Sequence, residues 1–244
     1  MKILTKITIL ASLLAIGLGT TLATTTDQLE LSVSGLTATF VDNVVGCTGT
    51  GCSGLSGDLN PAAGELVVLG TIGGWDITVT TGKSYSPSDV PVGLDLASLT
   101  ATCAAGAACD NETLSISYSD INFVADPAGY GTDYSATIAG SGSTSQSAYW
   151  DSSNTIFGTA NLTSHLIGTV GPFITTNHGS ASSAGSFTKP NSLTLEQAFT
   201  AVGTSGVSFS VDGDVYSTPE PGAVILLGTV LLFCASKLRR RRAS

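Results

Sequence analysis

The feature that most constrains the fold is a series of short segments in which apolar and polar residues alternate. Leu29 to Val33 and Leu36 to Val41 are the first two. Alternation with period two places every second side chain on one face, so each segment fits a half-buried β-strand. Glycine, asparagine, aspartate and proline separate the segments, as expected for turns. Further segments of this kind are Glu65 to Leu69, Trp75 to Thr80, Leu94 to Thr102, Thr113 to Phe123, Ser135 to Ile138, Gln146 to Trp150 and Val207 to Val211.

Three other segments need separate interpretation. Ser192 to Phe199 fits either a strand or a short helix capped by Ser192, and the strand character of its neighbours favours a strand. Ala139 to Ser147 and Gly179 to Ser186 have few apolar residues, so we interpret them as hairpin tips or surface loops. Roughly nine or ten short strands predict an all-β fold, an antiparallel β-sandwich of jelly-roll or immunoglobulin-like type.

The first 23 residues have the pattern of a secretory signal peptide. Lys2 and Lys6 precede the apolar run Ile7 to Leu18, and Thr21-Leu22-Ala23 supplies a small residue at the end. We predict a signal helix over residues 1–23 and cleavage between Ala23 and Thr24. An uncleaved anchor is the alternative, but the apolar run is short and polar residues follow at once. The predicted extracytoplasmic domain is 24–216.

The charged residues are distributed unevenly. Of the nine basic residues, only Lys83 and Lys189 lie between the two terminal segments, against seventeen acidic residues from Asp27 to Asp214. A net charge of about −15 repels nucleic acid and anionic lipid headgroups, so we expect no nucleic-acid partner. Such an excess keeps a secreted domain soluble, and the alternative is a specific cationic or calcium-bridged partner.

Four of the five cysteines form two close pairs. Cys47 and Cys52 lie in one Gly/Ala-rich loop segment, and Cys103 and Cys109 lie in another. Four cysteines allow three connectivities, and the short separations together with export favour the two local disulfides. Zinc is the alternative, but neither pair has the two-residue spacing of a zinc knuckle. Cys234 is then left unpaired in the C-terminal apolar run.

The C-terminal segment, 217–244, has three parts. Pro219-Glu220-Pro221 lies before the apolar run Ala223 to Ala235, and a basic cluster ends the segment. Prolines suit an extended stretch that a protease can reach. A helix from Ala223 to Leu238 spans about 24 Å, slightly less than a hydrocarbon core of about 30 Å, so we predict a transmembrane helix. The positive-inside rule keeps the cluster in the cytoplasm and the domain outside. The cluster is Arg239, Arg240, Arg241 and Arg242.

This three-part tail resembles the PEP-CTERM sorting signal of Gram-negative bacteria. The resemblance implies that a membrane-embedded exosortase recognises Pro219, Glu220 and Pro221 and cuts nearby, while the arginines retain the precursor in the membrane. It also implies an association with exopolysaccharide production. It covers about the last 26 residues, and a plain single-pass anchor with a Pro-rich stalk is the alternative.

No motif in the rest of the chain indicates catalysis. His165 and His178 are the only histidines, and neither has a metal-ligand spacing nor a Gly-x-Ser-x-Gly elbow nearby. We therefore expect no enzyme activity, no cofactor and no metal. Asp110-Asn111-Glu112 and Asp212-Gly213-Asp214 could offer oxygen ligands to calcium, but solvated turn carboxylates explain them better.

Aromatic residues are candidates for stacking against a glycan, although aromatics within strands more often belong to a core. The candidates are Trp75, Tyr85, Tyr130, Tyr134, Tyr149 and Trp150.

Three functional hypotheses follow. The first is a non-catalytic surface or matrix protein, exported through the inner membrane, transiently anchored there and then deposited at the cell surface or in extracellular polysaccharide. The second is a carbohydrate- or calcium-binding module of that matrix. The third is a secreted hydrolase, which requires a histidine within hydrogen-bond reach of a nucleophile.

Overall fold

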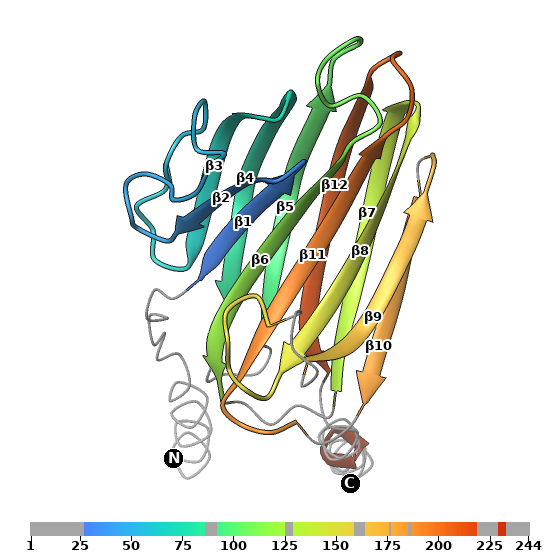
Figure 1. Ribbon diagram of the computed structural model, residues 1–244. Helices are drawn as coiled ribbons and strands as arrows, with labels where there is room; N and C mark the ends of the chain where they lie inside the picture. The colour runs from blue at the N-terminus through green and yellow to red at the C-terminus, as the bar shows by residue number, and fades with distance from the viewer. Residues whose placement is uncertain are drawn as a thin grey trace, which may run out of the picture.

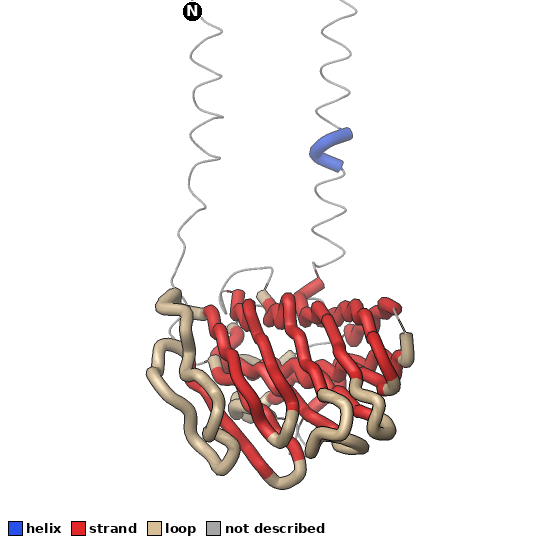
Figure 2. Tube along the Cα trace, turned by 90° about the horizontal axis from the view of Figure 1, so that it is seen from above, coloured by secondary structure: helices blue, strands red, loops and turns tan. Residues whose placement is uncertain are grey.

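The computed structural model is a sandwich of two antiparallel six-stranded sheets, which face each other as two layers (Figures 1 and 2). It describes residues 27–85, 92–124, 129–158, 164–175, 177–184, 187–218 and 229–232. Sheet A has the order β2-β1-β6-β11-β8-β9, and sheet B has the order β10-β7-β12-β5-β4-β3. The predicted all-β antiparallel sandwich is confirmed.

Most strands cover or extend the segments that alternation predicted. In sheet A they are β1 Gln28–Val33, β2 Leu36–Val41, β6 Thr113–Phe123, β8 Gly142–Asp151, β9 Ser164–Phe173 and β11 Asn191–Ala201. In sheet B they are β3 Glu65–Ile72, β4 Trp75–Tyr85, β5 Gly93–Cys103, β7 Gly129–Gly140, β10 Asn177–Ala184 and β12 Val207–Thr218.

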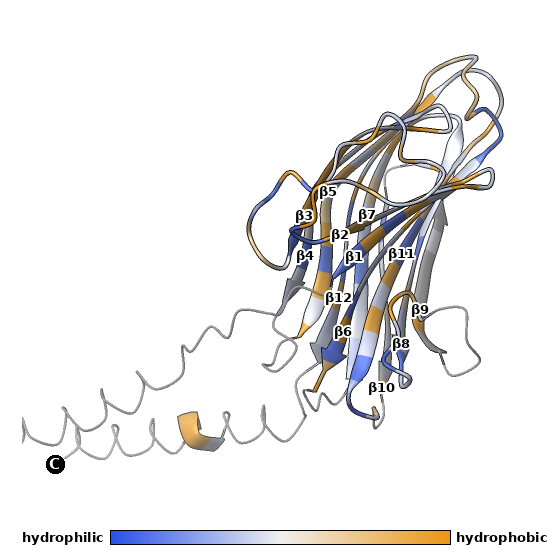
Figure 3. Ribbon diagram, turned by 60° about the vertical axis from the view of Figure 1, so that its left-hand side comes forward, coloured by the Kyte–Doolittle hydropathy of each residue, from blue (hydrophilic) through white to orange (hydrophobic). Residues whose placement is uncertain are grey.

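Alternate side chains of these strands fill the space between the sheets. In β12, Val207, Phe209, Val211 and Val215 are buried, while Ser208, Ser210, Asp212 and Asp214 reach the outer face. Hydrophobic and hydrophilic residues alternate in the same way along many strands in Figure 3. Phe209 lies between rings from both sheets, with centroids 6.0 Å from Trp75 and 5.4 Å from Phe199. Strands that carry one apolar face therefore bury it against the opposite sheet.

The ambiguous segment Ser192 to Phe199 is a strand, as expected, because it pairs with β6 on one side and β8 on the other. Two loop predictions are wrong. Gly179 to Ala184 pairs with β7 as part of β10, and Ala139 to Ser147 is mostly strand with a turn at Ser141. Serine and glycine weaken a strand intrinsically, but neighbouring strands supply the hydrogen bonds.

One loop covers the edges of both sheets on the β2 and β3 side. Thr48 exchanges backbone hydrogen bonds of 2.8 and 2.9 Å with Thr39 of β2. Further along the same loop, Ser56 N–H donates to Leu69 of β3 at 2.7 Å. Covered edges do not pair with other chains.

The chain enters and leaves the sandwich at one end. β1 begins and β12 finishes at the lower end in Figure 1. The predicted signal peptide, with Ala23 and Thr24, and the sorting motif lie outside the described residues, as do the arginine cluster and most of the predicted transmembrane helix. Residues 229–232 are helical. Within the described part of the chain, no helix is long and apolar enough to cross a membrane.

Candidate functional site

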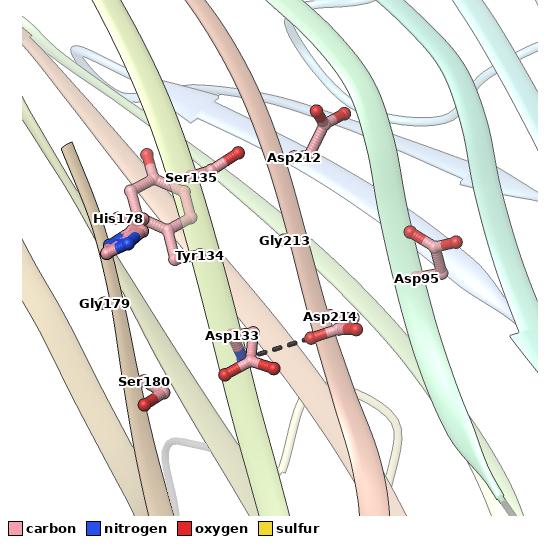
Figure 4. Close-up of a pocket in the computed structure, with 10 residues that line it drawn as sticks. All are labelled: Asp95, Asp133, Tyr134, Ser135, His178, Gly179, Ser180, Asp212, Gly213 and Asp214. Atoms are coloured by element: carbon pink, nitrogen blue, oxygen red, sulfur yellow. Dashed lines mark hydrogen bonds between the residues drawn. The ribbon is translucent and has the colours of Figure 1, made fainter. Parts of the chain in front are cut away.

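A groove with a volume of about 490 Å³ lies on sheet B, over β10, β7, β12 and β5. Figure 4 shows its lining side chains, several of which are carboxylates that project from neighbouring strands. Of the described residues that line it, none is a lysine or arginine. The lining residues are Asp95, Asp133, Tyr134, Ser135, His178, Gly179, Ser180, Asp212, Gly213 and Asp214.

Strand register places three of these carboxylates in one line across the sheet. Asp133 of β7 pairs with Asp214 of β12, and Asp214 pairs with Asp95 of β5. We call Asp133, Asp214 and Asp95 the acid row. Side chains directly opposite each other on antiparallel strands lie about 5 Å apart at Cβ, and like charges there repel. The Asp133 N–H donates to Asp214 Oδ1 at 3.0 Å, which fixes the central carboxylate.

The acid row continues into a salt bridge. Asp95 pairs with Lys83 of β4, and Lys83 pairs with Glu65 of β3. Lys83 Nζ lies 3.0 Å from Glu65 Oε1, and the ion pair is solvent-exposed. Lys83 is thus engaged with Glu65 outside the groove, and its charge also lowers the pKa of Asp95.

Tyrosines and glycines alternate in the next line of residues. Tyr216 of β12 pairs with Gly131 on one side and Gly93 on the other, and Gly93 also pairs with Tyr85 of β4. We call Tyr216 and Tyr85 the tyrosine row. A Cβ added at Gly131 would lie 2.8 to 3.0 Å from three atoms at the end of the Tyr216 side chain, so this ring lies across the glycine.

Each tyrosine is joined to the acid row. The Tyr85 hydroxyl donates to Asp95 Oδ2 at 3.3 Å, and the Tyr216 hydroxyl hydrogen-bonds Asp133. Tyr85 is 42% exposed, and Lys83 Nζ lies 5.6 Å from its ring centroid. The backbones of Tyr216 and Tyr85 lie on strands two apart, about 10 Å, and the Tyr216 ring extends over β7, away from β4.

A buried glutamine from sheet A supports the groove from below. Gln146 of β8 is fully buried, and its Nε2 donates to Thr132 Oγ1 at 2.7 Å and to the Asp133 carbonyl at 2.8 Å. Gln197 Nε2 in turn donates to Gln146 Oε1 at 2.9 Å. A Cβ at Gly213 would lie 1.7 Å from Gln146 Oε1, so only glycine fits between the groove and this pair.

A β-bulge orients the fourth carboxylate. Between β12 and β5 the register shifts, so that Asp212 faces Ala97 and Ser98. Ser98 has a φ of 53°, and its N–H donates to Asp212 Oδ1 at 2.6 Å. Bulges commonly redirect a side chain in this way.

The electrostatics of the groove disfavour negative charge. Partial burial raises the pKa of Asp95, and the nearby Asp212 raises it further. Burial likewise raises the pKa of Asp214, with contributions from the charges of Asp133 and Asp95. Desolvation also raises the pKa values of Tyr85 and Tyr216, so both hydroxyls are protonated donors at neutral pH.

Most of the aromatic candidates for glycan stacking are core residues, as expected for aromatic residues within strands. Trp75, Tyr130, Tyr134 and Trp150 are buried in the core, Tyr149 is half-buried on sheet A, and Tyr85 borders the groove. Sequence reasoning missed Tyr216. The alternating pattern could have identified it. Side chains two residues apart in a strand lie on the same face, so Tyr216 must share the face of Asp212 and Asp214.

The two acidic segments have different environments. Asp212-Gly213-Asp214 lines the groove, whereas Asn111 lies in the β5–β6 loop, where its Oδ1 accepts from Gly203 N–H at 2.8 Å. Within the described ranges, no three histidine, cysteine or acidic residues are placed to hold a metal ion. His178 lines the groove and pairs with Ser135, while His165 belongs to β9.

A second set of carboxylates lies inside the sandwich. Asp27, Asp42 and Asp120 are at most 2% exposed. Tyr118 donates to Asp27 Oδ2 at 2.7 Å, Ser84 to Asp120 Oδ2 at 2.6 Å, and Gly64 N–H to Asp42 Oδ2 at 2.9 Å. Burial raises the pKa of Asp27 to about 7.

Both predicted disulfides are present. Cys47 bonds Cys52 and Cys103 bonds Cys109, which agrees with an extracellular or periplasmic location rather than with zinc. Neither disulfide borders the groove.

No family model matches the chain, and no curated protein does either. Several solved structures are similar over part of it. The enzymatically active domain of tailspike protein 4 from bacteriophage CBA120 is 9% identical with a TM-score of 0.30, covering 57% of this chain and 19% of the tailspike chain.

Two other structures are similar at the same low level. TmCBM61 in complex with β-1,4-galactotriose is 8% identical with a TM-score of 0.29, covering 59% of this chain and 88% of that one. The VP2 subviral particle of infectious bursal disease virus is 13% identical with a TM-score of 0.37, covering 76% and 43%. None of these likenesses bears on the ligand or activity of this chain.

Proposed function

We propose that this protein is an exported, non-catalytic surface protein that binds polysaccharide on the outer face of sheet B. The observation that carries the proposal is Tyr216 lying across Gly131, with Tyr85 in the same row and the acid row beside both. A tyrosine ring that lies along the sheet offers an apolar face to a sugar ring. The neighbouring carboxylates accept hydrogen bonds from sugar hydroxyls.

The dimensions of the two rows suit an extended polymer. Strands are about 4.8 Å apart, so a chain laid across them meets a new side chain at intervals close to one sugar ring. The tyrosine row lies near the end of the sandwich where the chain leaves, because β12 ends at Thr218, two residues after Tyr216. The chain crosses repeatedly from one sheet to the other, and this connectivity favours the jelly-roll type over the immunoglobulin type.

Affinity electrophoresis tests this proposal. The full chain, extracted in mild detergent, is run through gels that contain neutral, anionic or amine-bearing polysaccharides. We expect at least one polymer to retard it and Tyr216→Ala to weaken that binding roughly fivefold, the equivalent of about 1 kcal/mol of ring stacking. Tyr149→Ala, on the other sheet, is the matched control. Absence of retardation in every gel, or equal losses in both variants, contradicts the proposal.

The tail supports the second half of the proposal, which is sorting by an exosortase. The supporting observation is the order of Pro219-Glu220-Pro221, apolar run and Arg239 to Arg242 in the sequence. We expect alanines in place of Pro219-Glu220-Pro221 to leave export and insertion intact, since these depend on the apolar run and the arginines. The variant then accumulates in the membrane at precursor size. Release with the parent's mature C-terminus, measured by intact mass, contradicts this idea.

A further inference from the structure

We propose that two copies of this protein join edge to edge, with β10 of one copy pairing antiparallel to β10 of the other. The contact uses backbone groups at the edge of sheet B, so it does not depend on which polysaccharide the groove binds. Three of the four edge strands of the sandwich are protected against such pairing, and β10 is not.

The loop between β2 and β3 occupies the outward edges of both strands. Gly51 N–H donates to the Thr37 carbonyl of β2 at 2.7 Å. On the other sheet, Thr71 N–H of β3 donates to the Gly54 carbonyl of the loop at 3.0 Å. The Cys47–Cys52 disulfide closes the part of the loop that lies along β2. Backbone groups on the outward side of both strands are therefore paired within the chain.

The third edge strand, β9 of sheet A, is irregular. Its register with β8 shifts at two places. Pro172 has no N–H to donate to a neighbouring strand, and Gly171 has a φ of 103°. Irregular pairing and proline are common means by which an edge strand avoids pairing with another chain.

The fourth edge strand, β10, has none of these features. Its eight residues, Asn177 to Ala184, pair with β7 in continuous register, and none is charged or a proline. The strand order places β10 at the end of sheet B, so no described strand pairs with it on the side away from β7 (Figure 1). A flat, uncharged edge strand of this length is a template on which another strand can pair.

The side chains of β10 favour a second copy over an unrelated peptide. A peptide that adds to a sheet edge is selected by pockets for its alternate side chains. From Gly179 to Ala184, β10 has only glycine, alanine and serine, which form no such pockets but allow a strand of the same kind to approach closely. A two-fold axis beside Ser180 or Ala181 closes the pair and puts residues of the same face opposite each other.

The charge of the domain permits contact at this edge. None of the seventeen acidic residues between the terminal segments lies in β10. The acid row begins one strand further in, at Asp133 of β7, which pairs with Ser180. In the joined sheet the two copies of Asp133 are three strand spacings apart, about 14 Å. This exceeds the Debye length of about 8 Å at 0.15 M salt, so repulsion between the two acid rows is largely screened.

Antiparallel pairing also fixes how the two copies are oriented. Within one copy, β1 begins and β12 finishes at the same end of the sandwich (Figure 1). A two-fold axis across the strands puts these ends on opposite sides of the joined sheet. The pair therefore suits copies that have been released from a membrane or that lie on two facing surfaces, and not neighbours anchored in one membrane.

Cysteine cross-linking of the full chain in mild detergent tests the contact. Cys234→Ser is introduced first, because the other four cysteines are already in disulfides. Ser180→Cys and Ala181→Cys are then oxidised separately. A residue beside the two-fold axis faces its own copy at about 5 Å, so we expect at least one of these variants to form a disulfide-linked dimer. Ser210→Cys, on β12 inside the same sheet, is the control and should form at least tenfold less dimer.

A matched pair of double variants tests association without a cross-link. Ser180→Glu with Ser182→Glu places like charges opposite each other across the pair, on the outer face of β10. Ser208→Glu with Ser210→Glu adds the same charge at the same spacing on β12. Sedimentation of the full chain over a range of protein and salt concentrations measures the dissociation constant. We expect the first double variant to weaken association roughly tenfold and the second less than about twofold.

Three outcomes overturn the pairing. A parent chain that stays monomeric at every concentration, while it still binds polysaccharide, overturns the pairing and leaves the proposed function standing. Equal cross-linking of Ser210→Cys shows that the copies associate elsewhere, for example through their tails. Equal weakening in the two double variants shows that net charge, and not the edge of β10, controls association. If the copies pair as expected but no polysaccharide is bound, the proposed function fails and the pairing stands.

Discussion

The protein holds two sets of neighbouring aspartates, and it treats them in opposite ways. Inside the sandwich, each of Asp27, Asp42 and Asp120 accepts hydrogen bonds from the groups that surround it, and all three are almost fully buried. On sheet B, the acid row faces solvent in a groove, with one backbone N–H on Asp214 and tyrosine hydroxyls at its two ends. Burial removes the interior carboxylates from water and disfavours their charged form, whereas the acid row lies in an open groove where a ligand can reach it.

The largest predicted effect is a pH dependence of stability caused by Asp27, one of the buried aspartates. Asp27 has a folded pKa of about 7 against an ordinary value of 3.8, because burial outweighs the Tyr118 hydrogen bond. The folded state therefore binds the extra proton between these values, and the free energy of unfolding decreases as pH rises through this window, by about 4 kcal/mol in total. Thermal unfolding from pH 4 to pH 8 measures it.

Asp27→Asn is the variant that isolates this group. It mimics the protonated side chain and keeps an oxygen for the Tyr118 hydroxyl, so we expect the pH dependence to flatten and the stability at pH 8 to increase. Asp76→Asn, at an exposed position of β4, is the control that should leave the pH dependence unchanged. An equally steep decline in Asp27→Asn shows that another group is responsible.

The next largest effect on stability concerns Gln146 and Gln197, which lie beneath the acid row. Gly213→Ala puts a methyl group 1.7 Å from Gln146 Oε1 and 2.5 Å from Gln197 Nε2, so the buried amide pair must separate. We expect a loss of about 3 kcal/mol in the free energy of unfolding, from overpacking and a broken buried hydrogen bond. Urea titration measures it.

Gly82→Ala is the matched control on the same sheet. An added Cβ there has its nearest neighbours at 3.5 Å, an ordinary contact distance. We expect a change below about 1 kcal/mol. Similar losses in the two variants contradict the role assigned to the Gln146 support.

The smallest effect tests the repulsion within the acid row. Asp214→Asn removes the central charge and retains an acceptor for the Asp133 N–H, so we expect the free energy of unfolding at pH 7 to increase by about 0.5 kcal/mol. The raised pKa of Asp214 also predicts an increase in stability on this substitution, because the fold disfavours the charged form of the side chain. The gain should disappear at acid pH, where the parent residue is protonated.

Glu196→Gln provides the comparison on sheet A. Its carboxylate accepts a hydrogen bond from Ser115 Oγ at 3.0 Å instead of facing another acid on its paired strands. We expect this variant to gain no stability at pH 7. A gain equal to that of Asp214→Asn means that net charge, and not the row, controls stability.

The all-β class, most of the strands and both disulfides could be predicted from the amino-acid sequence. These depend on local patterns, namely alternation with period two and cysteines five or six residues apart, and local patterns need no knowledge of neighbours. The same reasoning failed for Gly179 to Ala184, because glycine and serine carry no strand signal of their own and β7 supplies their pairing. The sorting tail is a sequence motif that stays a prediction.

The grouping of acidic and aromatic residues on sheet B depends on how distant strands pair, and it could not be predicted from the sequence. Asp95, Asp133 and Asp214 are far apart in the sequence, and strand register alone puts them in one row. Tyr216 became a candidate because Gly131, 85 positions earlier, lies on the strand beside it and leaves room for its ring. Register between distant strands is set by packing of the whole core, so no local pattern specifies it.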